Sequence, residues 1–519
     1  MEGKKIEKKK EKKKSSTKAT KTIKAEKEVE VVEEEVKLEK KVVKTSAEND
    51  KKTSHFLFKT LATSIFVAII LSWIIPAGTF SGANLTTTEP ARTGINEMFL
   101  SMFYASNYYL LQVIFVLIVG LFYGVLSRTN GYKKLVNKAS EFWQPRKKYF
   151  ALVHTVIIAL FASMATQSFP ILLFIPLIIS IASRLGYGKL KSVMITFGAM
   201  IVGFIGQTTS TLGLDYLEKT MSVKITTNLL VRYGILAIAL LLLNMVLIKM
   251  KNKKNNDKNL AVEQIDLVPL TGNENEGKAW PYVVIFALLF AFCILGYMPW
   301  NSAFGISAFD TFHTWLTTKV TVTIGGNSHA IFGYILGNIS AFGEWDIYTI
   351  CYIAMIILIF VKLFTKIKMN ELLEAAVEGI KKTLKPALFV VLAYTMFVIC
   401  YWGGFTNTIV DKIVGTTFNP ISATVANALA SFFHVDFGFS GFTLGATYAA
   451  RFADYTGTML VIMTSINGLV SLVAPTSVLL VTGLSMYDVS YKEWLKNICK
   501  FAVILLVLLL ILFSVMAYV

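Results

Sequence analysis

The chain has 519 residues, of which 54% are hydrophobic and only 16% are charged. A soluble globular domain carries about 25% charged residues, whereas this chain repeats apolar runs of about 20 residues, each long enough to cross a bilayer. The formal net charge of +18 is divided between a basic tail and short loops, so it indicates membrane topology rather than nucleic-acid binding. These features exclude a soluble globular protein and predict an all-α polytopic membrane protein.

Residues 1–55 form a low-complexity tail rich in Lys and Glu. Such a segment has too few apolar side chains to bury a core, so we expect a disordered cytoplasmic tail. Its charge would serve as an electrostatic tether to anionic lipid, or the tail is simply solvated, as most charge runs are.

The first half of the membrane region, residues 56–250, is expected to hold four spans and one hairpin. A basic amphipathic stretch at 131–148 suits the membrane interface, and Arg232 is expected to extend its charge toward water from the end of an apolar run. In chain order, the apolar runs are 57–76, 109–126, a pair of arms at 149–165 and 169–182, an interrupted run at 193–214, and 229–248.

A polar cytoplasmic linker, 251–279, separates the halves, and 280–345 adds a connecting helix and an outer loop. The second half occupies 346–519. It includes an amphipathic helix before residue 386 that we expect to lie on the membrane surface. The apolar runs of this half are 347–361, 386–403, a pair of arms at 421–433 and 442–452, an interrupted run at 464–483, and 498–519.

The distribution of basic residues predicts the topology. Clusters of Lys and Arg lie at 133–148, 184–191, 249–254, 362–368 and 492–500. Placing them in the cytoplasm makes this a multi-pass protein of the cell membrane with a cytoplasmic N-terminus. Both pairs of arms then become re-entrant hairpins, which leaves nine spans. The same order of elements occurs twice in opposite orientation, and such inverted repeats place a transporter's substrate site near the bilayer midplane.

The two interrupted runs place polar residues at the depth of the bilayer centre: "GFIGQTTSTLG" at 203–213, and "TSINGLVSLVAPTSVLLVTG" at 464–483. Non-helical backbone is tolerated there only if protein buries it or it lines a wet cavity. We therefore expect two broken helices whose exposed ends bind an ion or the charged end of a substrate. Gly206, Gly213, Gly468 and Pro475 are the residues expected to break them.

The tips of the two hairpins complete the candidate site. Any one polar stretch would also suit helix packing, but four stretches in matching positions of two halves favour a binding site. The predicted substrate- or ion-binding residues are Thr166, Gln167 and Ser168 at the first tip, Gln207, Thr208, Thr209, Ser210 and Thr211 in the first broken helix, Asp436 and Ser440 at the second tip, and Ser465, Asn467, Ser471, Thr476 and Ser477 in the second broken helix.

Two ionisable residues, His434 and Asp436, lie at the second tip. An ionisable group inside a membrane is costly and indicates function by default. The pair would carry a coupling proton, or Asp436 would bind a cationic substrate or Na⁺; the alternative is that the two residues pair with each other. No metal site and no cofactor other than a coupling Na⁺ or H⁺ is expected.

"SINGLVSLVAPTS", followed by "VSYKEWLK", resembles the C-terminal signature of the YfcC-like carriers. These belong to the ion-transporter superfamily, together with anaerobic C4-dicarboxylate carriers and arginine/ornithine antiporters. "WIIPAGTF" also looks like that family, and the resemblance covers most of residues 57–515. The second tip departs from the family pattern, and Thr166, Gln167 and Ser168 replace its usual acidic residues. The resemblance therefore implies the fold but not the substrate.

We interpret the chain as a secondary active transporter, a symporter or antiporter, that moves a small charged metabolite by alternating access. The metabolite is expected to be an amino acid or a carboxylate, and the resemblance puts basic amino acids and dicarboxylates on the shortlist without deciding between them. One alternative is a channel for ions or polar solutes, which needs a continuous polar path. A membrane enzyme has less support, because no catalytic motif or acid/base cluster is found. The expected partners are the substrate, the lipid bilayer and a second copy in a homodimer, and no nucleic acid is expected.

Overall fold

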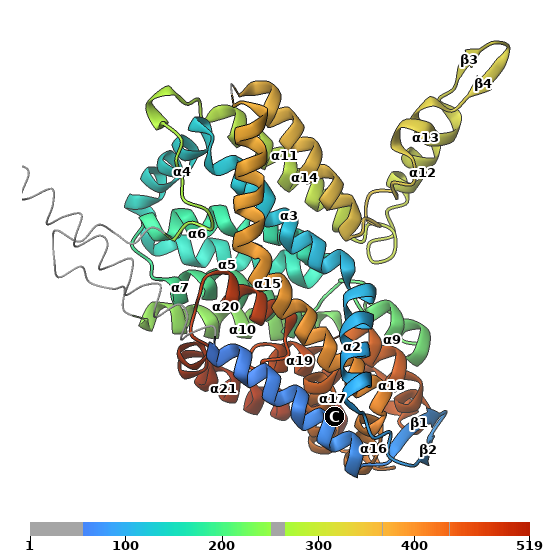
Figure 1. The fold of residues 1–519 in the computed structure, drawn as a ribbon. Helices are drawn as coiled ribbons and strands as arrows, with labels where there is room; N and C mark the ends of the chain where they lie inside the picture. The colour runs from blue at the N-terminus through green and yellow to red at the C-terminus, as the bar shows by residue number, and fades with distance from the viewer. Residues whose placement is uncertain (1–54, 251–264, 366, 435, 519) are drawn as a thin grey trace, which may run out of the picture. The chain divides into compact units, whose positions relative to one another are not determined.

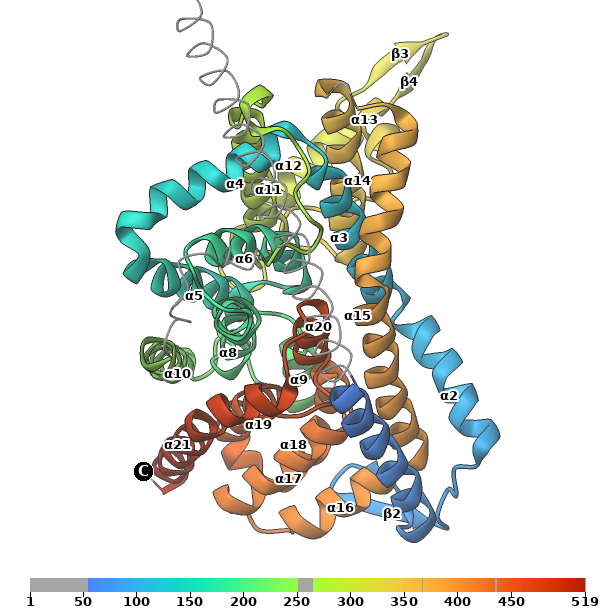
Figure 2. The same cartoon turned by 60° about the vertical axis from the view of Figure 1, so that its left-hand side comes forward.

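The computed structural model describes residues 55–250, 265–365, 367–434 and 436–518 (Figures 1 and 2). The predicted tail, apart from His55, and the first part of the predicted linker lie outside these residues. Helices dominate the described part, which confirms the all-α class. The first half contains the helix His55–Ile74, α2 (Ile95–Tyr108), α3 (Leu110–Ser127), α4 (Asn130–Trp143), η1 (Gln144–Arg146), α5 (Lys147–Met164), η2 (Phe169–Leu173), α6 (Ile175–Arg184), α7 (Lys189–Val193), η3 (Met194–Gly198), α8 (Ala199–Ile205), α9 (Leu214–Met221) and α10 (Leu229–Lys249).

The rest of the chain repeats the same order of elements after a connecting region. A long helix, a short amphipathic helix, a hairpin, an interrupted helix and a closing helix follow one another in both halves. The elements are η4 (Glu274–Glu276), α11 (Trp280–Tyr297), α12 (Ala308–Thr314), η5 (Trp315–Lys319), α13 (Ile331–Leu336), α14 (Ile347–Phe364), α15 (Met369–Gly403), α16 (Phe405–Val414), α17 (Pro420–Phe433), α18 (Phe437–Arg451), η6 (Ala453–Tyr455), α19 (Thr456–Ser471), α20 (Val478–Met486) and α21 (Tyr491–Tyr518).

Eight helices of the described part are long and apolar enough to cross a membrane. Seven of them coincide with the seven uninterrupted spans that hydropathy predicts. The eighth, Asn130–Met164, joins the interfacial stretch to the first hairpin arm. Two small antiparallel sheets, which were not predicted, occupy loops: β1 (Ala77–Ser81) pairs with β2 (Asn84–Thr88), and β3 (Val322–Ile324) pairs with β4 (Asn327–His329).

Both predicted pairs of arms form hairpins that return to the end where they began. In the first, the Tyr187 hydroxyl beyond α6 donates a hydrogen bond to the Lys147 carbonyl at the start of α5 (2.7 Å). In the second, Arg451 at the end of α18 donates to the Gly415 carbonyl just before α17 (3.2 Å) and pairs with Asp411. The side of the membrane on which each hairpin opens stays a prediction.

Both predicted broken helices are interrupted, but the second break lies further along than expected. The first helix stops at Ile205 and resumes at Leu214, so Gly206 and Gly213 flank the break. The second stops at Ser471 and resumes at Val478, with Pro475 between them. The prediction that Gly468 breaks the helix was wrong, because this residue lies inside α19, three positions before the helix ends.

The amphipathic segment before residue 386 was predicted to be a separate helix on the membrane surface, and this prediction was wrong. The segment is the first part of α15, a single helix that contains Pro386 and runs beside α3 in both views (Figures 1 and 2). The reason is a stripe of small residues, Ala375, Gly379 and Thr383, that is buried against α3. A Cβ atom added at Gly379 would lie only 2.9 Å from the Gly124 Cα. The two long helices therefore cross in backbone contact.

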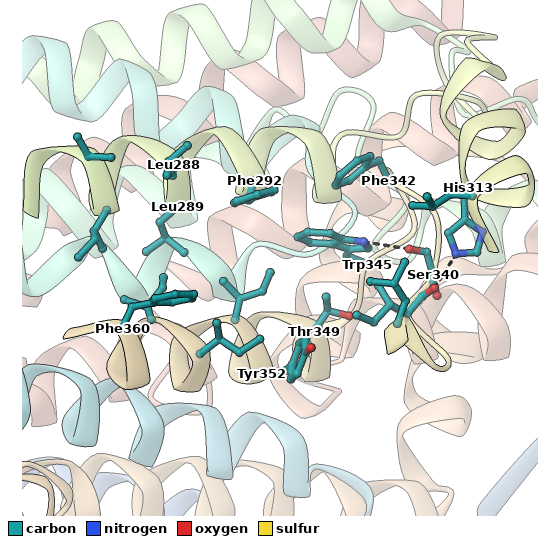
Figure 3. A pocket seen from close by; sticks show the side chains of 18 of the residues that line it. Leu288, Leu289, Phe292, His313, Ser340, Phe342, Trp345, Thr349, Tyr352 and Phe360 are labelled. Carbon is teal, nitrogen blue, oxygen red and sulfur yellow. Dashed lines mark hydrogen bonds between the residues drawn. The ribbon is translucent and has the colours of Figure 1, made fainter. Parts of the chain in front are cut away.

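One apolar cavity of about 840 Å³ lies between α11, α14 and the loop segment that contains α12 (Figure 3). Leu288, Phe292 and Phe360 are among its lining residues, and its rim is tied by a hydrogen bond from the Trp345 indole to the Ser340 carbonyl (3.0 Å). No predicted site residue lines this cavity. Its apolar lining does not suit a charged solute.

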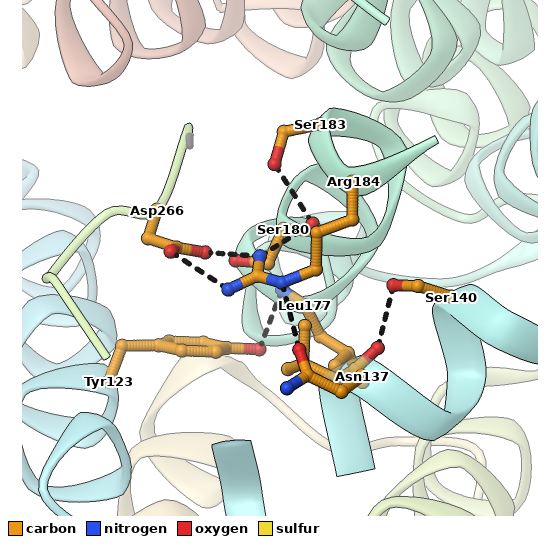
Figure 4. Close-up of polar contacts among 9 residues, drawn as sticks. Tyr123, Asn137, Ser140, Leu177, Ser180, Ser183, Arg184 and Asp266 are labelled. Carbon is orange, nitrogen blue, oxygen red and sulfur yellow. Dashed lines mark hydrogen bonds and ion pairs between the residues drawn. The ribbon is translucent and has the colours of Figure 1, made fainter. Parts of the chain in front are cut away.

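The described end of the linker contacts α4 and the ends of α3 and α6, and Figure 4 shows its ion pair with Arg184. Arg184, at the end of α6, forms a two-pronged ion pair with Asp266 (3.0 and 3.2 Å) and donates to the Asn137 side chain on α4 (3.2 Å). The side chains of Arg184 and Asp266 are only 11% and 5% exposed. The backbone N–H of Thr271 also donates to the Ser127 carbonyl at the end of α3 (3.0 Å).

The crossing of α3 and α15 predicts a strong effect of Gly379→Leu. The new side chain would meet the α3 backbone, so we expect the free energy of unfolding to fall by roughly 1–3 kcal/mol. Thermal unfolding of the full chain in detergent measures this. Gly234→Leu is the matched control, because nothing lies within 4 Å of a Cβ at that helix position. Equal melting temperatures for the two variants would contradict the crossing.

Removing one partner of the linker ion pair should also be costly. Asp266→Ala leaves the buried Arg184 charge without its carboxylate, and we expect a loss of about 3–5 kcal/mol. Glu378→Ala breaks the Arg128–Glu378 pair (2.6 Å), whose side chains are about 40% exposed, and should cost at most about 1 kcal/mol. The same unfolding assay compares the two variants. A larger loss of stability for Glu378→Ala would show that the Arg184–Asp266 pair contributes little to the stability of the fold.

Candidate functional site

Each break is held by the hairpin of its own half. In the first half, the Ser163 carbonyl at the end of α5 accepts hydrogen bonds from the backbone N–H groups of Thr208 (2.8 Å) and Ser210 (3.2 Å). In the second half, the Thr476 hydroxyl donates to the Phe432 carbonyl near the end of α17 (2.9 Å). Hairpin and break therefore form one unit in each half.

The two halves meet at their breaks. A Cβ atom added at Gly468 of α19 would lie 2.6 Å from the Ile205 Cα, at the last residue of α8. Gly468 thus permits a close crossing of the interrupted helices rather than the break itself. Gly213, at the other end of the first break, has a positive φ of 80°, and a Cβ there would lie 3.0 Å from the Gly438 nitrogen. The first break therefore contacts both the second interrupted helix and the second hairpin tip.

Several predicted site residues combine burial with a side-chain atom that has no hydrogen-bond partner in the described part of the protein. A buried polar atom without a partner costs about 1–3 kcal/mol and calls for an explanation such as a bound solute. These residues are Ser168, His434, Ser440, Ser465 and Asn467, all at least nine-tenths buried, and the partly buried Thr166. They come from both tips and from the second interrupted helix.

The other predicted residues mostly stabilise the backbone. The Gln207 amide donates to the Leu212 carbonyl across the first break (2.6 Å), and the Ser210 hydroxyl accepts from the Leu212 N–H (3.2 Å). The Thr209 hydroxyl donates to the Met164 carbonyl (3.4 Å). Gln167, Thr211 and Ser471 are half-buried beside these elements, and Ser477 is buried directly before α20.

His434 and Asp436 do not pair with each other. One Asp436 carboxylate oxygen accepts from the Phe439 N–H (3.1 Å) and so caps α18; the other accepts from the Tyr109 hydroxyl (3.1 Å). The Tyr109 ring stacks on Tyr394, with ring centroids 3.4 Å apart and planes 4° apart. His434 is 2% exposed and sits edge-on to aromatic rings. Tyr109 and the start of α18 thus hold the carboxylate, and the imidazole stands apart from it.

The model of the C4-dicarboxylate anaerobic carrier family matches residues 55–518 of the chain. The protein belongs to this family. It is therefore a multi-pass membrane transporter. Among solved structures, the YdaH transporter of Alcanivorax borkumensis, described as having an unusual topology, is similar over 89% of this chain and 98% of that chain, at 12% identity and a TM-score of 0.38. No curated protein matches the chain.

Two residues that contact the candidate site were not assigned to it by the sequence analysis. Arg232 does not extend toward water: it is fully buried and donates to the Gln207 carbonyl in the first break (3.0 Å) and to the Ile225 carbonyl. Its signal was a lone charge in an apolar run, which also suits a residue at the membrane surface. Tyr109 gave no signal, because its partner Asp436 is 327 positions away in the chain.

The Tyr109–Asp436 contact predicts that Tyr109→Phe destabilises the carrier. The variant keeps the ring stack but loses a hydrogen bond to a charged group, which should lower the free energy of unfolding by about 1.5–3 kcal/mol. Tyr104→Phe, one helix turn earlier and with a ring contact to Trp402, is the control. The effect should shrink in an Asp436→Asn background; an unchanged effect there would contradict the contact.

Proposed function

We propose that this carrier moves a small charged metabolite, an amino acid or a carboxylate, across the cell membrane by alternating access. The observation that carries the proposal is the crossing of α8 and α19 at Gly468 and Ile205, directly beside both breaks. Unpartnered buried polar atoms from the hairpin tips accompany it. Interrupted helices that meet in this way expose backbone ends to a shared solute.

Transport by this arrangement needs two states, and the hairpins supply the moving parts. Each hairpin holds the break of its own half, through backbone hydrogen bonds in the first half and through the Thr476 hydroxyl in the second, so it would move together with that break. We propose that the two halves form an inverted repeat, 56–250 and 346–519, with nine spans and a cytoplasmic N-terminus. One hairpin would then open to each side of the membrane.

The coupling ion, Na⁺ or H⁺, is proposed to act at the second tip, where His434 and Asp436 lie. Asp436 presents a carboxylate that two donors already orient, and it would bind either this coupling ion, as a hard oxygen ligand, or a cationic group of the solute. Symport and exchange are both compatible with this geometry.

Counterflow in proteoliposomes tests the transporter. We expect uptake of labelled succinate or of labelled amino acids to accelerate when the same solute is present on the opposite side, and to depend on a Na⁺ or pH gradient. Gly468→Leu should abolish this acceleration, because the interrupted helices no longer cross closely, while Gly234→Leu should retain it. Flux that neither saturates nor responds to solute on the opposite side would instead identify a channel.

A further inference from the structure

The closing helix of each half begins beside the break of that half. The fourth residue of α10 is Arg232, and the fourth residue of α21 is Trp494. Arg232 donates to the Gln207 carbonyl in the first break (3.0 Å), and the Trp494 indole donates to the Leu472 carbonyl in the second (2.9 Å). Two equivalent positions thus do the same structural task, once with a charged donor and once with a neutral one.

The charge on Arg232 is not needed for that task, as Trp494 shows. Arg232 is 0% exposed, no carboxylate pairs with it in the described part of the chain, and its Nε has no hydrogen-bond partner there. A buried cation without a counter-ion carries a desolvation cost of several kcal/mol. The negative group of a bound solute would offset that cost.

Asp436 carries the charge opposite to that of Arg232. Within the described residues no cation pairs with it; its oxygens accept from one N–H and one neutral hydroxyl. This corner therefore suits an ammonium group better than a second carboxylate.

The two charges belong to one region of the molecule. Gly213 ends the break that Arg232 holds, and a Cβ there would lie 3.0 Å from the Gly438 nitrogen. A Cβ at Gly438 would in turn lie 3.3 Å from the Asp436 Oδ1. The first break and the second tip are therefore in contact, with an unpaired cation on one side and an unpaired carboxylate on the other.

We propose that the site selects a dipolar solute, with its carboxylate directed to the first break and Arg232, and its ammonium group directed to Asp436. This inference rests on the proposed transport function and narrows its substrate class. A dicarboxylate would meet the like charge of Asp436, and a diamine would meet that of Arg232; like charges brought together weaken binding. The chain would thus differ in preference from the dicarboxylate in its family's name.

Binding of four probes of matched size to the full chain tests the proposal: 4-aminobutyrate, 2-aminobutyrate, succinate and 1,4-diaminobutane, at equal ionic strength. We expect the two aminobutyrates to raise the melting temperature most. Arg232→Gln should weaken aminobutyrate binding by about tenfold or more, the loss of one charge-assisted contact, and should not weaken diamine binding. Asp436→Asn should weaken aminobutyrate binding and not succinate binding.

Trp494→Phe is the matched control, since it removes the equivalent donor without changing charge. It should lower stability like Arg232→Gln but leave the order of the probes unchanged. Strongest stabilisation by succinate or by the diamine, stabilisation by none of the four, or an equal effect of Arg232→Gln on every probe would overturn the proposal. The binding assay does not depend on flux. If the protein bound the probes with this charge preference but failed the counterflow assay, the proposed transport function would be rejected and the proposed selectivity would stand.

Discussion

A helix interrupted inside a membrane leaves N–H and C=O groups that lipid cannot satisfy, and the arrangement of this carrier follows from that constraint. The groups that a break exposes must find partners within the break, as at Gln207, Ser210 and Leu212, or on another element. The first break relies on the Ser163 carbonyl and the Arg232 guanidinium, and the second on the side chains of Trp494 and Tyr491. Hairpin, break and closing helix are thereby joined in each half.

The second requirement of this fold is that the backbones of crossing helices come close together, and glycine residues at the crossing points permit this. Gly124 and Gly379 bring α3 and α15 together, and Gly468 brings α19 onto the end of α8. Small residues are the means by which membrane helices pack, because the lipid is as apolar as the helices and gives no hydrophobic drive for association. The crossings therefore fix where the two halves, and with them the two breaks, meet.

Charge is used sparingly in the interior, and each instance has a different environment. Arg184 and Asp266 satisfy each other at the end of the linker, whereas Arg232 and Asp436 are held by neutral groups. A paired charge contributes to the architecture, whereas an unpaired one would retain an electrostatic preference for a solute.

The sequence by itself determined the helical class, the seven uninterrupted spans, the two hairpins and the presence of two breaks, because hydropathy, charge and helix-breaking residues are local properties. It misplaced what depends on distant neighbours: Gly468 was assigned to the break although it serves a crossing, and the first part of α15 was assigned to the membrane surface. Only the tertiary structure decided the partners of Arg232 and Tyr109 and the backbone bonds of Thr208 and Ser210. Those contacts join residues far apart in the chain, so no local pattern could reveal them.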